Sequence, residues 1–140
     1  MNREIKFRAF DKVKGVMSQV LKVDLWGANF EDRKVFLLNG GVSRSGGDYE
    51  LMQYTGFKDK NDVEIYDQDI IGDLIEVDGK MEQSTQTVYF DEMLGQWMLD
   101  ISANQDRTVS YSLFSELQDF EYEVLGNGFE NPDLIKNKIS

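Results

Sequence analysis

The sequence predicts a mainly β fold: an N-terminal β-hairpin, a small and strongly bent barrel of the SH3 type, and one or two short helices near the C-terminus. Apolar and polar residues alternate in many short segments, which is typical of half-buried strands. The 140 residues include a single proline, as expected where strands need their N–H groups for pairing. Segments with helical spacing are few, so we expect a chain dominated by short strands.

Residues 4–23 predict the first hairpin. Ile5, Phe7 and Ala9 fall on one side of a strand, and the residues between them are charged. Residues 11–15 are rich in turn-forming types, so residues 16–23 can return as the second arm.

Residues 35–38 form a short apolar run followed by Asn-Gly-Gly. A buried strand ended by a turn and a single turn of core helix both fit this pattern. Serine and glycine then dominate residues 40–47, which we interpret as a mobile loop. We predict one domain over residues 1–140, in which this loop separates an N-terminal hairpin region, 1–47, from a barrel region, 48–140.

Turn chemistry between β-branched runs predicts the start of the barrel region. Residues 50–54 can form a strand, and residues 59–62 can reverse it, because asparagine and aspartate tolerate the left-handed conformation. Residues 70–77 form a β-branched run in which Gly72 suits a bulge. The Asp-Gly pair at 78–79 is the preferred sequence for a two-residue type I′ hairpin turn.

The rest of the region supplies strands and the helices. Three further strands are predicted at residues 87–90, 97–101 and 121–125. A short helix fits residues 112–117, where three apolar side chains share a face. A second helix begins at Asn131, because asparagine can cap a helix, the following proline suits its first position, and the next aspartate meets the positive end of its dipole.

The composition excludes several kinds of chemistry. The chain has no cysteine and no histidine, which excludes a thiolate nucleophile, an imidazole base, a disulfide and a thiolate zinc site. Carboxylates, lysine, tyrosine or an oxygen-ligated metal remain. Asp67, Asp69 and Asp73 form the one cluster worth testing for metal or acid–base chemistry, although Ile71 occupies a ligand position of the nearest calcium-loop pattern. We expect no catalytic residue and no cofactor.

The charge is large and uneven. The formal net charge is −11, yet residues 1–22 carry +4, so the remaining residues carry −15. Residues 59–78 alone hold eight carboxylates and one lysine. Ordinary solvent-exposed surface explains such patches, but two sharper interpretations stay open. One is a head-to-tail oligomer through the basic segment, and the other is an acidic surface that imitates nucleic acid. Direct binding to nucleic acid is not expected.

Five residues are candidates for an interaction surface. Arg3, Lys6 and Arg8 lie on the basic first strand, and Tyr54 and Trp97 are aromatic residues in predicted strands. For the two rings, packing in a core or at a barrel mouth is the competing interpretation, with a peptide or subunit contact as the second.

The sequence also bears on the compartment. No run approaches the roughly 18 apolar residues that a membrane span needs, and no basic-then-apolar leader opens the chain. We therefore expect a cytoplasmic protein with no membrane contact.

Separated blocks of this sequence, in the right order, resemble the YopX family of phage and prophage proteins. The blocks are residues 3–11 (REIKFRAFD), 51–61 (LMQYTGFKDKN), 64–66 (EIY), 123–127 (EVLGN) and 130–132 (ENP). They span nearly the whole chain, and the Met-Gln-Tyr-Thr-Gly string is the most specific. The chain departs from the family pattern at Phe10, where tryptophan is frequent, and at Asp62 and Gln68, where glycine is usual.

The resemblance implies a small, largely β protein from a phage or prophage of a low-GC Gram-positive bacterium. It implies no established activity and brings no catalytic residues. The blocks are interpreted as determinants of the fold, with a binding surface as the alternative.

Three functional hypotheses follow. The first is a non-enzymatic accessory protein that binds protein, including itself as a homo-oligomer through strand edges and the opposite charges of its two parts. The second is an acidic, nucleic-acid-mimicking inhibitor of a host DNA- or RNA-binding protein. The third is a carboxylate- or metal-dependent hydrolase that uses the aspartate cluster.

Overall fold

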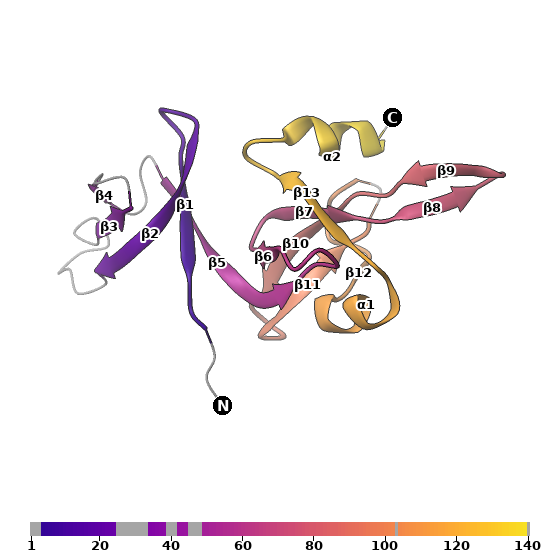
Figure 1. Cartoon of the computed structure of the whole chain (residues 1–140), viewed down its shortest axis with the longest axis horizontal. Coiled ribbons are helices and arrows are strands. Elements are labelled where there is room, and N and C mark those ends of the chain that lie inside the picture. Colours follow the sequence, from indigo (N-terminus) through magenta and orange to yellow (C-terminus); the bar gives the residue numbers. More distant parts are fainter. Residues whose placement is uncertain (1–3, 25–33, 39–41, 45–48, 103, 140) are drawn as a thin grey trace. The chain divides into compact units, whose positions relative to one another are not determined.

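The computed structural model describes residues 4–24, 34–38, 42–44, 49–102 and 104–139 (Figure 1). The chain forms two compact units, Met1–Tyr54 and Thr55–Ser140. Each unit is described separately below.

The first unit is an antiparallel arrangement of strands. Its strands are β1 (Phe7–Asp11), β2 (Val16–Asp24), β3 (Lys34–Leu37), β4 (Val42–Arg44) and β5 (Tyr49–Lys58), which continues into the second unit. They are hydrogen-bonded in the order β4-β3-β2-β1-β5. Ala9, Val35 and Leu37 form the buried cluster of this unit.

The structure confirms the predicted hairpin of this unit. Strand β1 pairs antiparallel with β2, with Arg8 opposite Gln19 and Asp11 opposite Val16. The apolar run at 35–38 forms a strand and not a helical turn. The predicted loop was wrong at residues 42–44, which form β4 against β3. The rest of the predicted loop, residues 40–41 and 45–47, lies outside the described residues. The Asn-Gly-Gly turn at residues 39–41 also lies outside them.

The second unit contains a five-stranded antiparallel sheet and a separate hairpin. Its strands are β6 (Glu64–Tyr66), β7 (Asp69–Gly72), β8 (Leu74–Val77), β9 (Lys80–Gln83), β10 (Gln86–Asp91), β11 (Gln96–Asp100), β12 (Ser110–Ser112) and β13 (Glu123–Asn127). The five-stranded sheet has the order β12-β11-β10-β7-β13, whereas β8 and β9 pair as a two-stranded sheet. Strand β6 pairs with the end of β5.

Both predicted helices are present. Helix α1 (Leu113–Asp119) begins after Ser112, whose side chain accepts a hydrogen bond from the Ser115 N–H. Helix α2 (Pro132–Ile139) starts at the proline. Leu113 is buried in the main core together with side chains of β6, β7, β10 and β11, and with Tyr122; these are Ile65, Ile71, Val88, Trp97 and Leu99. Phe114, which was predicted to share the buried face, is half exposed.

The run at 70–77 differs from the prediction. It is divided between β7, which belongs to the five-stranded sheet, and β8, which belongs to the two-stranded one. Gly72 is not a bulge: a Cβ there would collide with the carbonyl oxygen of Ser84, so close backbone approach requires the glycine. The irregularity lies in β13, between Val124 and Gly126.

At the level of fold class, the prediction is confirmed: the protein is mainly β, with antiparallel sheets and two helices near the C-terminus. Closure of the second unit into a barrel stays a prediction, and so does the single domain. The division between the units falls after Tyr54, within a continuous strand. Among the residues described, no helix combines the length and apolar character needed to cross a membrane.

Candidate interaction surface

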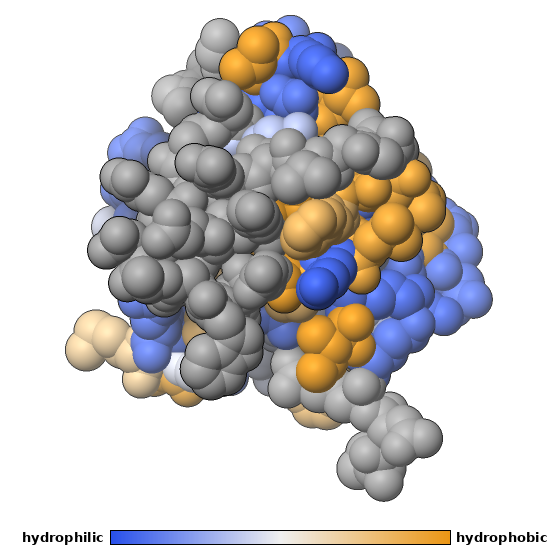
Figure 2. All heavy atoms as spheres, turned by 90° about the vertical axis from the view of Figure 1, so that its left-hand side faces the viewer, coloured by the Kyte–Doolittle hydropathy of each residue, from blue (hydrophilic) through white to orange (hydrophobic). Residues whose placement is uncertain are grey.

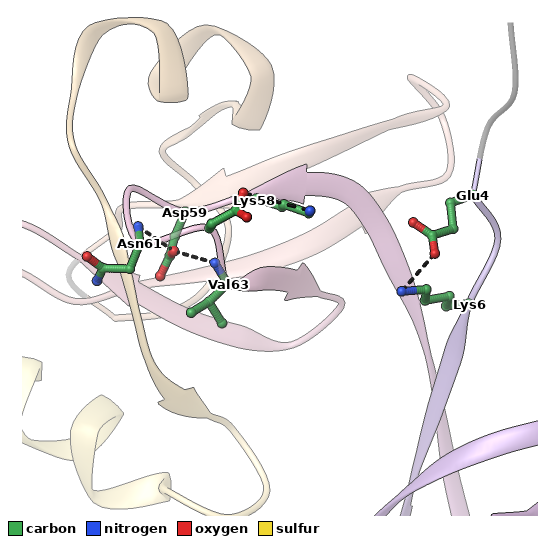
Figure 3. Close-up of polar contacts among 7 residues, drawn as sticks. Glu4, Lys6, Lys58, Asp59, Asn61 and Val63 are labelled. Atoms are coloured by element: carbon green, nitrogen blue, oxygen red, sulfur yellow. Dashed lines mark hydrogen bonds and ion pairs between the residues drawn. The ribbon is translucent and has the colours of Figure 1, made fainter.

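The basic first strand is partly neutralised by its own neighbours. The Lys6 ammonium lies 2.8 Å from a Glu4 carboxylate oxygen (Figure 3) and 5.7 Å from the centre of the Tyr54 ring. Arg8 is half-buried in β1. Arg3 lies outside the described residues. Lys6 therefore does not present an unbalanced charge, which weakens the case for β1 as a strongly basic docking strand.

A shallow groove runs beside this strand. It measures about 370 Å³ and is lined by residues 5–7 and 19–23, including the exposed side chains of Ile5 and Leu21. Figure 2 shows hydrophobic and hydrophilic residues side by side on the face that it presents. The groove has no deep, enclosed part that would surround a small molecule.

The two aromatic candidates lie in the interior. Tyr54 is 4% exposed and Trp97 is 9% exposed. Trp97 packs edge-on against Phe90, with 5.1 Å between the ring centroids, and belongs to the main core. Neither ring is presented at the surface, so the contact role proposed for them has no geometric support.

The three candidate aspartates act locally. The buried carboxylate of Asp69 accepts a hydrogen bond from the Tyr66 N–H at 2.7 Å, which closes the turn between β6 and β7. Asp67 accepts one from its neighbour Gln68, and Asp73 accepts one from the Leu74 N–H. In the part of the chain that the structure describes, no three metal-ligating side chains gather closely enough to hold an ion.

Asp59, which the sequence places in a turn, makes a contact with β13 that sequence reasoning missed. Its Oδ1 accepts hydrogen bonds from the N–H groups of Asn61 and Val63, both at 2.8 Å (Figure 3), and its Oδ2 accepts one from the Val124 N–H at 2.8 Å. One buried carboxylate thus ties the β5–β6 turn to β13. The signal was its place in a turn of the specific sequence block, and its role is structural.

Two hairpin turns share one geometry. Asp11 Oδ1 accepts hydrogen bonds from the N–H groups of Val13 and Lys14, and Gly15 donates to the Asp11 carbonyl with φ +69°. Those N–H groups, that of Lys14 first, lower the pKa of Asp11. The second turn repeats this pattern at Asp91, with Met93, Leu94 and Gly95 in the corresponding places.

The signal for this repetition is the string Phe-Asp-x-x-x-Gly, which occurs at residues 10–15 and again at 90–95. Both turns expose an apolar residue at their centre, since Val13 is 75% exposed and Met93 is 96% exposed. Leu94 and Phe90 are also exposed next to Met93, so the second turn presents a small apolar surface.

Three further ionisable side chains of the second unit, those of Tyr122, Asp100 and Asp106, have hydrogen-bond partners close by. Burial, followed by the nearby Glu116 carboxylate, raises the pKa of Tyr122 above its usual range, and the Tyr122 hydroxyl donates to Glu116 at 3.2 Å. Asp100 Oδ1 accepts hydrogen bonds from both the N–H and the hydroxyl of Ser102. The hydroxyl of Thr108 lowers the pKa of Asp106 in the same loop. The Asp100 and Asp106 side chains order the described part of the loop at residues 100–108.

The β8–β9 hairpin, here called the arm, is the most unusual surface. It comprises Leu74–Val77 and Lys80–Gln83, and every one of these residues is exposed. Four of them are large and apolar: Leu74, Ile75, Val77 and Met81, which are 56%, 44%, 38% and 63% exposed. Figure 1 shows the arm extending away from the five-stranded sheet of its own unit.

The arm also lacks support from the described residues, because β8 and β9 pair only with each other there. A lone two-stranded hairpin is at best marginally stable in water. The turn that closes it is well formed, with φ +51° at Asp78 and +80° at Gly79. Sequence reasoning predicted this turn but not the exposure of the strands. The arm is therefore the candidate interaction surface of the second unit.

Comparison with known proteins finds one matching family and two similar crystal structures that cover most of the chain. Residues 6–136 match the profile of a family described as YopX protein. The crystal structure of protein EF1440 from Enterococcus faecalis is similar with a TM-score of 0.63 at 22% identity, over 96% of this chain and 99% of that one. Protein yopX from Bacillus subtilis is similar with a TM-score of 0.56 at 18% identity, over 92% and 96%. No curated protein matches the sequence. At these identities the two structures share the fold.

Proposed function

This chain belongs to the YopX family, and on that premise we propose that it works by binding protein and not by catalysis. As part of the proposal, it is a phage or prophage accessory protein that acts in the cytoplasm of its bacterial host. It needs no cofactor for this role.

The arm carries the proposal. The arm is a hairpin without support from other strands among the described residues, and a partner that covered its large apolar side chains would stabilise it. Exposed apolar patches of this kind mark interaction sites in soluble proteins. Met81, at 63% exposed, and Leu74, at 56%, are the most accessible of these side chains. The turn patch of Phe90, Met93 and Leu94, at the end of β10 that is farther from the arm in sequence, offers a second apolar contact in the same unit.

Charge supports a protein partner over a nucleic acid. The net charge of −11 repels phosphate backbones, and the basic Lys6 is already paired with Glu4. The partner is another protein or a further copy of this chain. If the partner is a further copy of this chain, the attraction comes from exposed strand edges and from the opposite charges of residues 1–22 and residues 23–140.

Retention of partners from host lysate tests the proposal. The immobilised wild-type protein is compared with a Leu74→Asn, Met81→Asn variant of the arm and with a Val13→Asn control, which changes an even more exposed apolar residue in the first unit. We expect a discrete protein that the wild type and the control retain and the arm variant loses. Identical retention by all three would remove the arm from the proposal.

Catalysis is tested separately. The purified protein is incubated with nucleotide, phosphoester, glycoside and carboxyl-ester substrates, with and without magnesium, manganese or calcium. Turnover at a useful rate that Asp67→Asn, Asp69→Asn or Asp73→Asn abolishes would replace the binding proposal with the hydrolase alternative.

The inhibitor alternative has its own signature. If the retained partner is a DNA- or RNA-binding protein and added nucleic acid displaces this chain from it, the acidic surface acts as a mimic of that nucleic acid. The eight carboxylates of residues 59–78 are the ones to neutralise in that case.

A further inference from the structure

Strand β9 has one edge that pairs with no other strand among the described residues. The Ser84 N–H donates to the Asp73 carbonyl at 2.8 Å, so the pair at the base of the arm is a hydrogen-bonded one. Antiparallel pairs alternate between hydrogen-bonded and non-hydrogen-bonded, and the register places Glu76 opposite Met81. By this alternation, the N–H and C=O groups of Met81 and Gln83 point away from β8. They are available to another strand.

We propose that two copies of this chain associate by antiparallel pairing of their β9 strands about a two-fold axis at Met81. The proposal rests on the contact function given above and names its partner. A two-fold axis between antiparallel strands places one residue opposite itself, since only residues of the same orientation can pair. The choice within the strand is therefore among a few discrete registers.

Charge selects the register. With the axis at Met81, Lys80 of one copy lies opposite Glu82 of the other, and the same contact forms twice. Opposite charges directly across a strand pair are stabilising, and like charges are destabilising. An axis at Lys80 would set two lysines opposite each other, and an axis at Glu82 would set two glutamates opposite each other. A lysine on an exposed strand edge disfavours pairing with another strand. In this register the Lys80 charge is balanced by Glu82 of the other copy.

Apolar contact favours the same register. Met81, the most exposed apolar residue of the arm, meets its own counterpart in the other copy. On the opposite face, each Lys80–Glu82 pair has an apolar residue on either side. Val77 lies next to Lys80 in its own arm, and Ile75 lies next to Glu82 in the other arm. The edge of β8 is less suited, since an axis at Ile75 sets Leu74 opposite Glu76.

A charge-reversal cycle tests the register on the intact chain. Lys80→Glu and Glu82→Lys each convert two attractive pairs into two repulsive ones, so we expect each to weaken dimerisation about tenfold or more. The double variant Lys80→Glu, Glu82→Lys restores both attractions with the wild-type composition and net charge. We expect its dimerisation constant to return to within about threefold of the wild type. Analytical ultracentrifugation over a concentration series gives the constants.

A single introduced cysteine tests the axis. The chain has no cysteine, so any disulfide must join two copies. Met81→Cys would place two Cα atoms about 5.5 Å apart, within the range of a disulfide, and two thiols lose two protons and two electrons to an added oxidant, oxidised glutathione. Gln83→Cys is the matched control on the same strand and face, because its counterpart would lie about 13 Å away.

The outcomes separate this proposal from the contact function. Rescue by the double variant, together with preferential cross-linking at residue 81, supports β9 pairing. A wild type that is monomeric at high concentration, a double variant that is not rescued, or equal cross-linking at 81 and 83 overturns it. None of these results affects retention of a different protein by the arm, which the lysate experiment measures independently.

Discussion

Several aspartates among the described residues accept hydrogen bonds from backbone N–H groups. Asp11 and Asp91 each bind two N–H groups in a hairpin turn, Asp59 binds three, and Asp69 and Asp100 close turns in the second unit. A buried backbone N–H group that is left without an acceptor lowers the stability of the fold. Part of the acidic character of the chain is thus explained by local folding requirements.

Asp59 provides the strongest test at this scale. We expect Asp59→Ala to lower the free energy of unfolding by about 3 kcal/mol, because three N–H groups from two distant segments lose their acceptor. Asp62→Asn is the control: its side chain is 85% exposed, its ion pair to Lys58 is long at 3.7 Å, and asparagine tolerates its left-handed φ of +66°, so we expect a change within about 0.5 kcal/mol. Urea unfolding followed by tryptophan fluorescence measures both. Equal effects would show that the Asp59 contacts contribute little.

Asp11 makes stability depend on pH. Its pKa is below the ordinary 3.8 in the folded protein because of the N–H groups of Lys14 and Val13, so folding favours the ionised form. The resulting stabilisation is complete well above pH 3.8 and is lost as the pH falls through the lowered folded value. We expect the difference in unfolding free energy between wild type and Asp11→Asn to be constant near neutral pH and to shrink as the pH falls from about 3.8 to that lowered value. A difference that grows on acidification would contradict this assignment.

Residue patterns predicted the aspartate cluster and the aromatic contact residues poorly, because residues that are close in sequence need not act together in the folded protein. Asp67, Asp69 and Asp73 are close in sequence, yet each carboxylate accepts a hydrogen bond from a different nearby residue, Gln68, Tyr66 and Leu74 respectively. Tyr54 and Trp97 were compatible with both core and surface, and only the packing of the strands decides between them. The repeated turn was detectable, because its aspartate and glycine recur at the same spacing.

Among the elements, those with a strong local signal were predicted. The first hairpin, the Asp-Gly turn of the arm and the two helices each have characteristic turn or capping residues. Strand β12, whose sequence is Ser-Tyr-Ser, has no such signal and forms because it pairs with β11. The division of the run at 70–77 depends on Ser84, which accepts and donates hydrogen bonds with Asp73 across the base of the arm.

The arm depends more on its turn than any other element does. Gly79 has φ +80°, a conformation that costs an alanine roughly 1 kcal/mol or more. Because a lone hairpin has little stability to lose, we expect Gly79→Ala to open the arm locally and to weaken dimerisation, while global unfolding changes little. Amide exchange should quicken for residues 74–83 and stay unchanged in β10 and β11. Faster exchange throughout the second unit would show instead that the arm is an integral part of its fold.

On the scale of the whole molecule, charge distinguishes two modes of self-association. Two copies that pair through β9 each carry −11, so their overall repulsion opposes a contact whose charged pairs are short-ranged. Docking of the basic residues 1–22 of one copy on the acidic remainder of another would be an attraction instead. Salt therefore acts in opposite directions on these two modes.

We expect the β9-paired dimer to tighten severalfold as salt rises from about 10 mM to about 150 mM. Over this range the screening length falls from about 30 Å to about 8 Å, which removes most of the repulsion between the two acidic molecules but little of the attraction between adjacent Lys80 and Glu82 side chains. Sedimentation of the wild type across this range measures the effect, and the double charge-swapped variant should respond identically because its net charge is unchanged. Association that weakens steadily with salt would assign the contact to the opposite charges of the two parts of the chain.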